Sequence, residues 1–360
     1  MKILIIPMKS KRAAVNHNCS FQQQKIITKS HLSQSEYTAK TAIPFREAFG
    51  DRFVQGSVLS LDVETCKAVL EGGREVAWSH CLVAVGSLGP LPGRSLQLTM
   101  GGLEQEAKVM AENIEKAEKV VIIGGGPVGF ELAGEIFDKY KQEKRVTIVS
   151  SSEKLVSSDF SSKFDASVKY LWESAGVEVV VGKADLTSVK LNQVEKQSVK
   201  VGETELEADL VISCIGMPPN KAEVAKLLPA SSIDETGRAK VDEFLAVEGC
   251  SNVFALGDCC NTPEHKMAAH AAVHAETVVA NILLEAEGKA RKAYKQKFVG
   301  MLVPFGAKGG AGSFDGWNLP NFAVVRFVNE FSPHGLVSNM MGEGHSTQTL
   351  RSSSGDVEVK

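Results

Sequence analysis

Three glycines well inside the chain have the spacing of a phosphate-binding turn. Gly124, Gly126 and Gly129 form the pattern G-x-G-x-x-G. In this pattern the first glycine permits a tight turn, the second lets a pyrophosphate approach the backbone, and the third lets a helix pack closely on a strand. The other residues of the turn that we assign to cofactor binding are Gly125, Pro127 and Val128. The pattern predicts a dinucleotide site.

The sequence around this turn predicts the elements that must position it. Val120–Ile123 is an apolar, β-branched run with the length of a buried strand, and an amphipathic helix is expected over Pro127–Tyr140. The amides and dipole of that helix would point at the phosphates. A second strand is expected at Val146–Val149. This context favours a dinucleotide site over a simple tight turn in an α/β domain.

The residue after the second expected strand bears on the choice of dinucleotide. Ser150 stands where an acidic residue would accept the ribose hydroxyls of NAD. A serine does not exclude the 2′-phosphate of NADP, and Lys154 could pair with it, although a lysine after a strand is often only solvated. The sequence therefore leaves NADH and NADPH both open.

Three further apolar runs end in glycine turns, at residues 80–93 (HCLVAVGSLGPLPG), 210–220 (LVISCIGMPPN) and 250–260 (CSNVFALGDCC). The residues of these turns that we expect to contact a cofactor are Ala84, Gly86, Ser87, Gly216, Gly257 and Asp258. A glycine before an aspartate lets the carboxylate reach a ligand where the backbone passes closely. Each turn alone could be a simple strand terminator, but their order around the central motif favours one common site.

This order of turns resembles the two-dinucleotide flavoprotein oxidoreductases. Four segments narrow the resemblance to the apoptosis-inducing-factor-like, ferroptosis-suppressor branch, which is similar to type II NADH dehydrogenases: IPFREAFGDRFVQGSVLSLD, GGGPVGFELAGEI, HKMAAHAAVHAETVVANI and VPFGAKGGAGSF. The resemblance covers roughly residues 36–328.

The resemblance implies an α/β fold with two Rossmann-like domains, for FAD and for NAD(P)H, the second inserted in the first, plus a partial α+β C-terminal domain. The expected boundaries are 1–35 for an atypical N-terminal segment, 36–104 and 230–290 for an incomplete FAD-binding domain, 105–229 for the NAD(P)H-binding domain, and 291–360 for a C-terminal domain with a divergent tail.

The resemblance also implies roles for single residues on the FAD side. Val58 would lie near the adenine, and Asp258 would hydrogen-bond the ribityl or pyrophosphate region. Lys266, Met267 and Ala268 would begin a helix whose positive end faces the flavin pyrimidine and stabilises the reduced ring. We therefore count Lys266 among the catalytic candidates.

Glu131 is the second catalytic candidate. It matches an acid that lies beside the nicotinamide in the resembled family. The alternative is an ordinary acid in the first turns of a helix, favoured there by the helix dipole.

One part of the resembled pattern is missing from the sequence. A FAD domain of this kind begins with its own strand, G-x-G-x-x-G turn and helix, whereas no glycine precedes Gly50 here. MKILIIP could imitate the first strand, but nothing after it can hold a pyrophosphate. We therefore expect the motif at Gly124 to be the second of two, with the first lost or replaced, as in a spliced or incompletely predicted coding sequence.

Three functions compete at this point. The first is a FAD-dependent NAD(P)H oxidoreductase reducing a quinone-like acceptor, an acceptor that rests on the resemblance alone. The second is a cofactor-deficient isoform or regulatory pyridine-nucleotide-binding protein without flavin activity. The third, a dehydrogenase with a single Rossmann domain, would leave Gly257–Asp258 without a role. The lack of a C-x-x-x-x-C pair argues against a disulfide reductase.

Composition excludes some other classes. The chain of 360 residues is 43% hydrophobic and 23% charged with a net charge of −3, which gives no electrostatic case for binding nucleic acid. No apolar run approaches the roughly 20 residues of a membrane span, so we expect no transmembrane segment and at most peripheral membrane contact. The cysteines suit a reducing compartment and lack metal-ligand spacing. We expect a cytoplasmic protein, with membrane or lipid-droplet association possible and a mitochondrial location less favoured.

Overall fold

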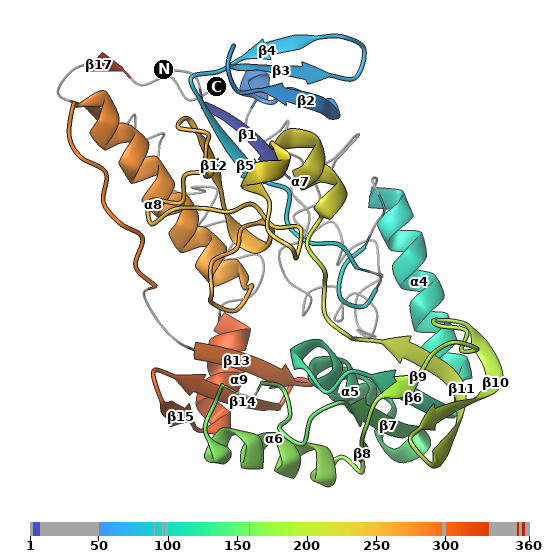
Figure 1. Ribbon diagram of the computed structural model, residues 1–360. Helices are drawn as coiled ribbons and strands as arrows, with labels where there is room; N and C mark the ends of the chain where they lie inside the picture. The colour runs from blue at the N-terminus through green and yellow to red at the C-terminus, as the bar shows by residue number, and fades with distance from the viewer. Residues whose placement is uncertain are drawn as a thin grey trace.

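The computed structural model describes residues 3–7, 50–89, 91–95, 97, 100–157, 159–296, 300–330, 351–352 and 355–356. These residues form a mixed α/β protein with two main sheets that contain parallel strands (Figure 1). β5 (His80–Ala84) and β12 (Val253–Ala255) pair in one sheet, although every strand of the other sheet lies between them in sequence. This confirms the expected fold of two Rossmann-like units with one inserted in the other, while the domain boundaries stay predictions.

The first sheet has the strand order β1-β5-β12, with all strands parallel. The opening apolar run forms β1 (Ile3–Pro7) and pairs with β5, so it takes the place of a first strand as expected. One face of the sheet is covered by α8 (Ala268–Ala286), whose Val278 and Ile282 share a buried cluster with Phe254 of β12. The N-terminus of α8 thereby lies close to the turn that follows β12.

A small antiparallel sheet stands beside this unit at the top of Figure 1. Its strands are β2 (Val58–Asp62), β3 (Lys67–Leu70) and β4 (Glu75–Ala77). The sequence predicts a hairpin here, with strands at Gly56–Leu61 and Ala68–Leu70, and the pairing of β2 with β3 confirms it. The sequence also predicts a helix near Pro44–Phe49, which lies outside the described residues.

The second sheet has the order β8-β7-β6-β11-β10-β9. Its strands are β6 (Lys119–Ile123), β7 (Arg145–Ser150), β8 (Glu178–Val181), β9 (Ala184–Asp185), β10 (Val194–Val201) and β11 (Thr204–Ser213). The strands β8, β7, β6 and β11 run parallel, whereas β10 and β9 are antiparallel. Ile122 and Ile148 face one core, and Val121 and Val149 face another, because successive side chains of a strand point to opposite faces.

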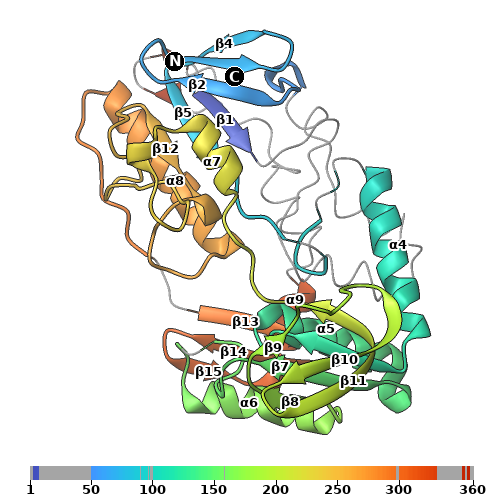
Figure 2. The same cartoon turned by 45° about the vertical axis from the view of Figure 1, so that its right-hand side comes forward.

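Three helices contribute to the core on the Ile122 side of this sheet. They are α4 (Met100–Lys116), α5 (Pro127–Tyr140) and α6 (Ser162–Ser174). The bounds of α5 match the prediction. The sequence also predicts a charged connecting helix over residues 105–118, and α4 is this helix with an earlier start. In Figure 2, α4 stands at the right of the view, with its lower end beside the second sheet.

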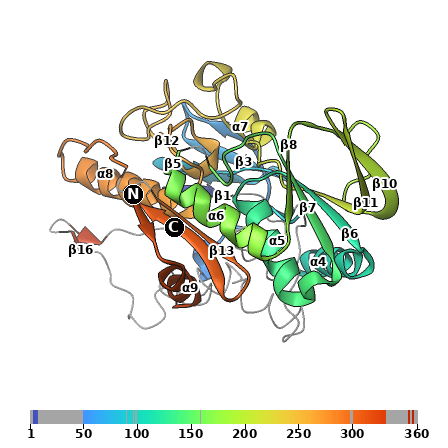
Figure 3. The ribbon, with the colours of Figure 1, turned by 90° about the horizontal axis from the view of Figure 1, so that it is seen from below.

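The chain then forms an antiparallel sheet with a helix, namely β13 (Gly300–Phe305), β14 (Gly309–Phe314), β15 (Trp317–Leu319) and α9 (Asn321–Glu330). This sheet lies against α5 and α6 (Figure 3). The rings of Phe130 in α5 and Phe305 in β13 have centroids 5.0 Å apart. Gly134 permits this approach, since a Cβ there would lie 2.6 Å from the backbone nitrogen of Gly306. The C-terminal sheet therefore packs on the helix of the glycine motif.

The remaining short elements are η1 (Gly50–Arg52), η2 (Lys141–Glu143), α7 (Lys221–Leu227), η3 (Ala230–Ser232), η4 (Gly257–Cys259), β16 (Arg351–Ser352) and β17 (Gly355–Asp356). Among the described residues, no helix has both the length and the apolar character that crossing a membrane would require.

Candidate functional site

The glycine loop between β6 and α5 is shaped by contacts with its neighbours. Gly124 has a φ of +122°, and a Cβ there would lie 2.5 Å from the carbonyl oxygen of Cys214. A Cβ on Gly129 would lie 2.1 Å from the carbonyl oxygen of Gly124, because the first turn of α5 packs directly on the loop. Both positions therefore require glycine, for the two reasons that the motif predicted.

Gly126 is different from the other motif glycines, because a Cβ added there would meet no protein atom within 4 Å. It is the N-cap of α5, with a φ of −78°, and Pro127 follows at the start of the helix. The helix dipole gives this open position a partial positive charge. A phosphate could approach the backbone at Gly126 without meeting protein atoms, as the motif predicts.

Ser150 lies beneath the glycine loop at the end of β7. It is only 4% exposed, and its hydroxyl donates to the carbonyl oxygen of Ser152 at 2.7 Å. A Cβ on Gly125 would lie 2.7 Å from the Ser150 Oγ, so the two small residues allow the loop and strand to meet. The Ser150 hydroxyl is thus engaged within the turn, and its predicted role in cofactor binding stays a prediction. The exposed residues there are Ser151, Ser152, Glu153 and Lys154.

The segment after β7 folds back over the glycine loop. The N–H of Val156 donates to the carbonyl oxygen of Gly125 at 2.7 Å. Val156 has a φ of +65°, which is a strained conformation for a β-branched residue. No sequence pattern predicted this contact, because it depends on the path of a loop rather than on local preference.

Glu131 lies in the second turn of α5 and is only 5% exposed. It acts on the Cys214 thiol at the end of β11: burial, and then the Glu131 carboxylate, raise the pKa of that thiol. Glu131 is therefore a buried acid in the second turn of α5, close to the end of β11. The position is compatible with the predicted place beside the nicotinamide.

The turns after β5 and β11 are hydrogen-bonded to each other. The N–H of Asn220 donates to the carbonyl oxygen of Gly86 at 3.1 Å, and the N–H of Leu88 donates to that of Pro218 at 2.8 Å. Gly86 and Gly216 have φ values of +62° and +66°, which favour glycine. Two of the predicted turns are thus brought together, and they connect the two Rossmann-like units.

Asp258 connects the turn after β12 to the turn after β5. Its Oδ2 accepts from the Ser87 hydroxyl at 2.6 Å and from Nη2 of Arg94 at 3.1 Å. Burial lowers the pKa of Arg94, and the Asp258 carboxylate partly offsets that effect. Sequence reasoning missed Arg94, which stands in no recognisable motif. Asp258 therefore lies beside the turn at Gly86 with part of its carboxylate already bound by the protein, and its predicted contact with FAD stays a prediction.

Val58 and Ala84 take less specific places. Val58 begins β2 opposite Leu70 and is half-buried against the core below β5. Ala84 is the last residue of β5, before the turn at Gly86. Their predicted contacts with the adenine and with the closing turn stay predictions.

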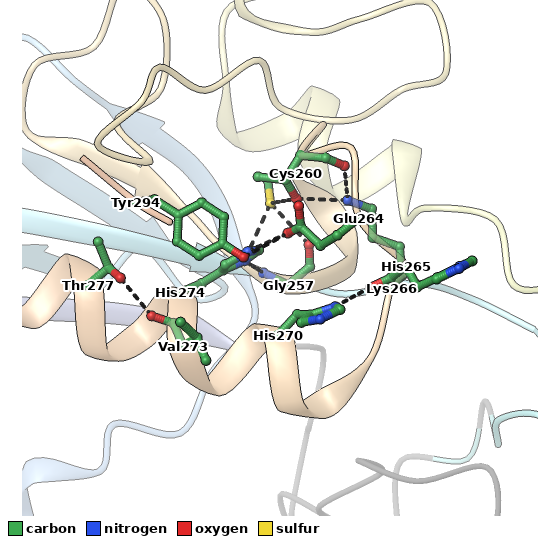
Figure 4. Close-up of polar contacts among 11 residues, drawn as sticks. Gly257, Cys260, Glu264, His265, Lys266, His270, Val273, His274, Thr277 and Tyr294 are labelled. Atoms are coloured by element: carbon green, nitrogen blue, oxygen red, sulfur yellow. Dashed lines mark hydrogen bonds and ion pairs between the residues drawn. The ribbon is translucent and has the colours of Figure 1, made fainter. Parts of the chain in front are cut away.

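A buried polar cluster lies behind the Asp258 turn (Figure 4). The N–H of Gly257 donates to Nδ1 of His274 at 3.1 Å, and Nε2 of His274 lies 2.7 Å from Oε1 of Glu264. The Tyr294 hydroxyl donates to the same Glu264 oxygen at 3.3 Å. Sequence reasoning missed this cluster, since the only signal was polar residues within an otherwise apolar helix.

The start of α8 lies beside both units. Met267 is the N-cap and Ala268 the first helical residue, and Met267 packs against the core of the second sheet. Nζ of Lys266 donates to the Thr262 hydroxyl at 2.9 Å, so the ammonium braces the preceding loop. The structure ties Lys266 to this loop, and its catalytic role stays a prediction.

One ion pair links the loop after β7 to the segment before α8. Nε2 of His265 lies 2.8 Å from Oδ2 of Asp159, and the His265 ring stacks on Phe160 with centroids 6.0 Å apart. The nucleotide loop and the start of α8 are therefore in direct contact. Within the residues described here, most of the predicted positions lie at the carboxyl ends of parallel strands, where α/β sheets bind ligands. Val58 is an exception, because it lies in the antiparallel sheet of β2, β3 and β4.

Comparison with known proteins agrees with this arrangement. Residues 3–274 match the family described as pyridine nucleotide-disulphide oxidoreductase, and the chain belongs to that family. It is therefore an oxidoreductase with a flavoprotein-reductase fold, as the resemblance predicted.

Individual proteins and structures are similar to this chain over most of its length. The chain is 33% identical to ferroptosis suppressor protein 1 of Mus musculus over 297 residues, covering 81% of this chain and 79% of the relative. It is 30% identical to apoptosis-inducing factor homolog A of Dictyostelium discoideum over 278 residues, covering 72% and 67%. The structure of NDH2 from Plasmodium falciparum in complex with NADH superposes with a TM-score of 0.69 at 13% identity, over 96% of this chain and 98% of that chain.

The described residues fit the two expected cofactors unequally. The glycine loop has the open backbone at Gly126 that a pyrophosphate requires. On the other side, the closing turn at Gly86 and the carboxylate of Asp258 are in place. The sequence that follows β1, however, contains no glycine before Gly50. The described residues therefore fit the pyrophosphate of NAD(P)H at Gly126 and the ribityl side of FAD at Gly86 and Asp258.

Proposed function

We propose that this protein is a FAD-dependent NAD(P)H oxidoreductase that passes electrons to a quinone-like acceptor. The observation that carries the proposal is the glycine loop, whose backbone is open at Gly126 and whose following helix buries Glu131 one turn further on. In this arrangement the loop and the N-terminus of α5 would bind the pyrophosphate. The Glu131 carboxylate would orient the nicotinamide end of the nucleotide, and holding the reacting groups in the reactive geometry speeds the transfer.

The chain's own residues would bind FAD from the opposite side. Asp258 and the turn at Gly86 would hold the ribityl region, and the positive end of α8 at Ala268 would favour negative charge on the pyrimidine. FAD, when bound, supplies the hydride and electron chemistry that side chains lack. The contact of Asp159 with His265 would keep the two halves of the site together and limit access of water.

A quinone-like acceptor is favoured over a disulfide. The sequence contains no C-x-x-x-x-C pair, and the cysteine thiols at positions 214, 259 and 260 are buried with raised pKa values, which disfavours the thiolate. We propose a cytoplasmic protein that meets an apolar acceptor at the surface of a membrane or lipid droplet, by peripheral contact and without nucleic acid.

One set of measurements tests the function. NADH and NADPH are titrated into the purified protein by calorimetry, and the visible spectrum is recorded with and without added FAD. Oxidation of the preferred nucleotide is then followed with a soluble short-chain quinone. Nucleotide binding together with quinone-dependent oxidation supports the proposal. If the protein binds nucleotide and FAD but transfers no electrons to the quinone, the proposal of a quinone-like acceptor is overturned.

A second candidate is supported by one observation. Because no glycine stands before Gly50, the chain could be a pyridine-nucleotide-binding protein that does not retain flavin. In that case the protein is colourless after purification, binds NAD(P)H, and oxidises it no faster than buffer when FAD is added. The spectrum therefore separates the two functions before any acceptor is tested.

A further inference from the structure

The turn that carries Asp258 is held from behind by His274. Gly257 has a φ of +70°, and its N–H is directed at Nδ1 of His274, 3.1 Å away. A Cβ at position 257 would lie 3.3 Å from the Cβ of Ala271, so α8 approaches the turn closely. The orientation of Asp258 toward Ser87 thus depends on a backbone conformation that α8 supports.

The contacts of His274 define its protonation state. Nδ1 accepts from the Gly257 N–H and so cannot carry a proton, and Nε2 must therefore carry one and donate it to Glu264 at 2.7 Å. The side chains of His274 and Glu264 are only 1% and 2% exposed. This geometry describes a neutral imidazole beside an ionised carboxylate.

The titration directions agree with this geometry. Burial lowers the pKa of His274, and hydrogen bonds and charge from Glu264 only partly oppose it. Burial alone would raise the pKa of Glu264, but hydrogen bonds from its own N–H, Thr262 and His274 outweigh burial and hold the pKa below its usual value. At neutral pH His274 is therefore neutral and Glu264 is ionised.

Other titratable groups surround the imidazole on several elements. Cys260 Sγ lies 3.9 Å from Nδ1, and the Tyr294 ring meets the imidazole edge-on with centroids 4.7 Å apart. Burial and Glu264 raise the pKa of Tyr294 to about 12, so its hydroxyl remains a donor. The charges of Lys266 and of His270 on α8 itself both oppose protonation of His274.

We propose that His274, oriented by Glu264, is a positioning residue that holds the Gly257–Asp258 turn in its ligand-binding conformation. The proposal rests on the proposed function, because Asp258 is the expected ligand of the flavin ribityl region. A proton added to Nδ1 removes the acceptor of the Gly257 N–H and releases the turn. His274 thereby makes flavin retention sensitive to acid without contacting the flavin.

The first experiment reads the turn directly and needs no cofactor. The full chain is labelled with 15N in histidine and glycine, and NMR reports the His274 tautomer and the exchange rate of the Gly257 amide. His274→Asn keeps an acceptor near the place of Nδ1, whereas His274→Leu removes it. His270→Asn is the matched control, since His270 lies on the same helix and is bound to the carbonyl oxygen of His265 instead.

We expect His274 in the Nε2–H form and a protected Gly257 amide in the wild type, His270→Asn and His274→Asn. In His274→Leu, exchange at Gly257 should rise by about tenfold or more, as expected for one lost hydrogen bond. A proton on Nδ1 of His274, or equal protection of Gly257 in His274→Leu, would overturn the proposal.

The second experiment measures FAD affinity by flavin fluorescence between pH 5 and 8. Wild-type affinity should fall as the pH is lowered past the range where His274 takes up a proton, and this decline should be absent in His274→Asn. His274→Leu should bind FAD about tenfold more weakly at pH 8. Identical pH profiles of FAD affinity for wild type and His274→Asn would overturn the proposed acid sensitivity of flavin binding. If the wild type binds no FAD at any pH, the proposed function fails, while the NMR experiment still decides the role of His274.

Discussion

Gly126→Ala separates ligand binding from folding at the glycine loop. The new methyl group would meet no protein atom within 4 Å, and the φ of −78° suits alanine. Replacing glycine should stabilise the folded state by about 0.4–1 kcal/mol through the unfolded chain. Alanine at an N-cap should cost on the order of 0.5–1 kcal/mol. The two effects nearly cancel, so the free energy of unfolding should change by less than about 0.5 kcal/mol.

Nucleotide binding by Gly126→Ala should behave differently. A methyl group in the path of the pyrophosphate should lower the binding affinity for NAD(P)H by about tenfold or more, which corresponds to roughly 1.4 kcal/mol of binding free energy. Calorimetric titration gives the affinity, and urea unfolding gives the stability of the same preparation. Gly129→Ala is the comparison, because its Cβ would lie 2.1 Å from the Gly124 carbonyl oxygen and should destabilise the fold itself. Wild-type affinity in a folded Gly126→Ala protein would refute the assignment of the site.

Three other predictions concern the acid, the flavin and pH. With FAD loaded, Glu131→Gln should slow flavin reduction in stopped-flow experiments more than it weakens nucleotide binding, and an unchanged rate would make Glu131 a structural acid only. If the second candidate function holds, the purified chain should bind FAD poorly, and replacing residues 1–35 by a strand, G-x-G-x-x-G turn and helix should restore binding; a yellow protein with stoichiometric FAD would instead support the FAD-dependent oxidoreductase. Because the folded-state pKa of His274 is lowered from 6.5, stability should fall as the pH drops below 6.5, by about 1.4 kcal/mol per unit until the folded pKa is reached. Urea unfolding of His274→Asn should lack that slope.

Local sequence was sufficient for the elements around the glycine loop. The apolar strand β6, the helix α5 from Pro127 to Tyr140 and the strand β7 were predicted closely, because each follows from periodicity and from the motif. The reasons given for Gly124 and Gly129 also appear as close contacts in the structure. The family was also predicted from the sequence, because the order of the glycine turns along the chain resembles that of the family.

The burial of the Ser150 side chain could not be predicted in this way. Its position at the end of β7 was read correctly, but whether its hydroxyl faces solvent or the glycine loop depends on how residues 151–156 return over that loop. Val156 takes a positive φ that its residue type disfavours, so tertiary contacts override local preference there.

The sequence by itself determined the glycine loop at Gly124–Gly129 and the open backbone at Gly126, since these depend on residue type and spacing. The two Rossmann-like units and their insertion followed from the resemblance to a known family. Only the tertiary structure decided which side chains meet across long separations in the chain: Arg94 and Ser87 on Asp258, and Glu264 on His274 beneath Gly257. The physical reason is that a buried charge or imidazole is tolerated only where a partner lies within hydrogen-bond distance. That partner is chosen by the packing of α8 and of the turns on the sheet, which no local pattern specifies.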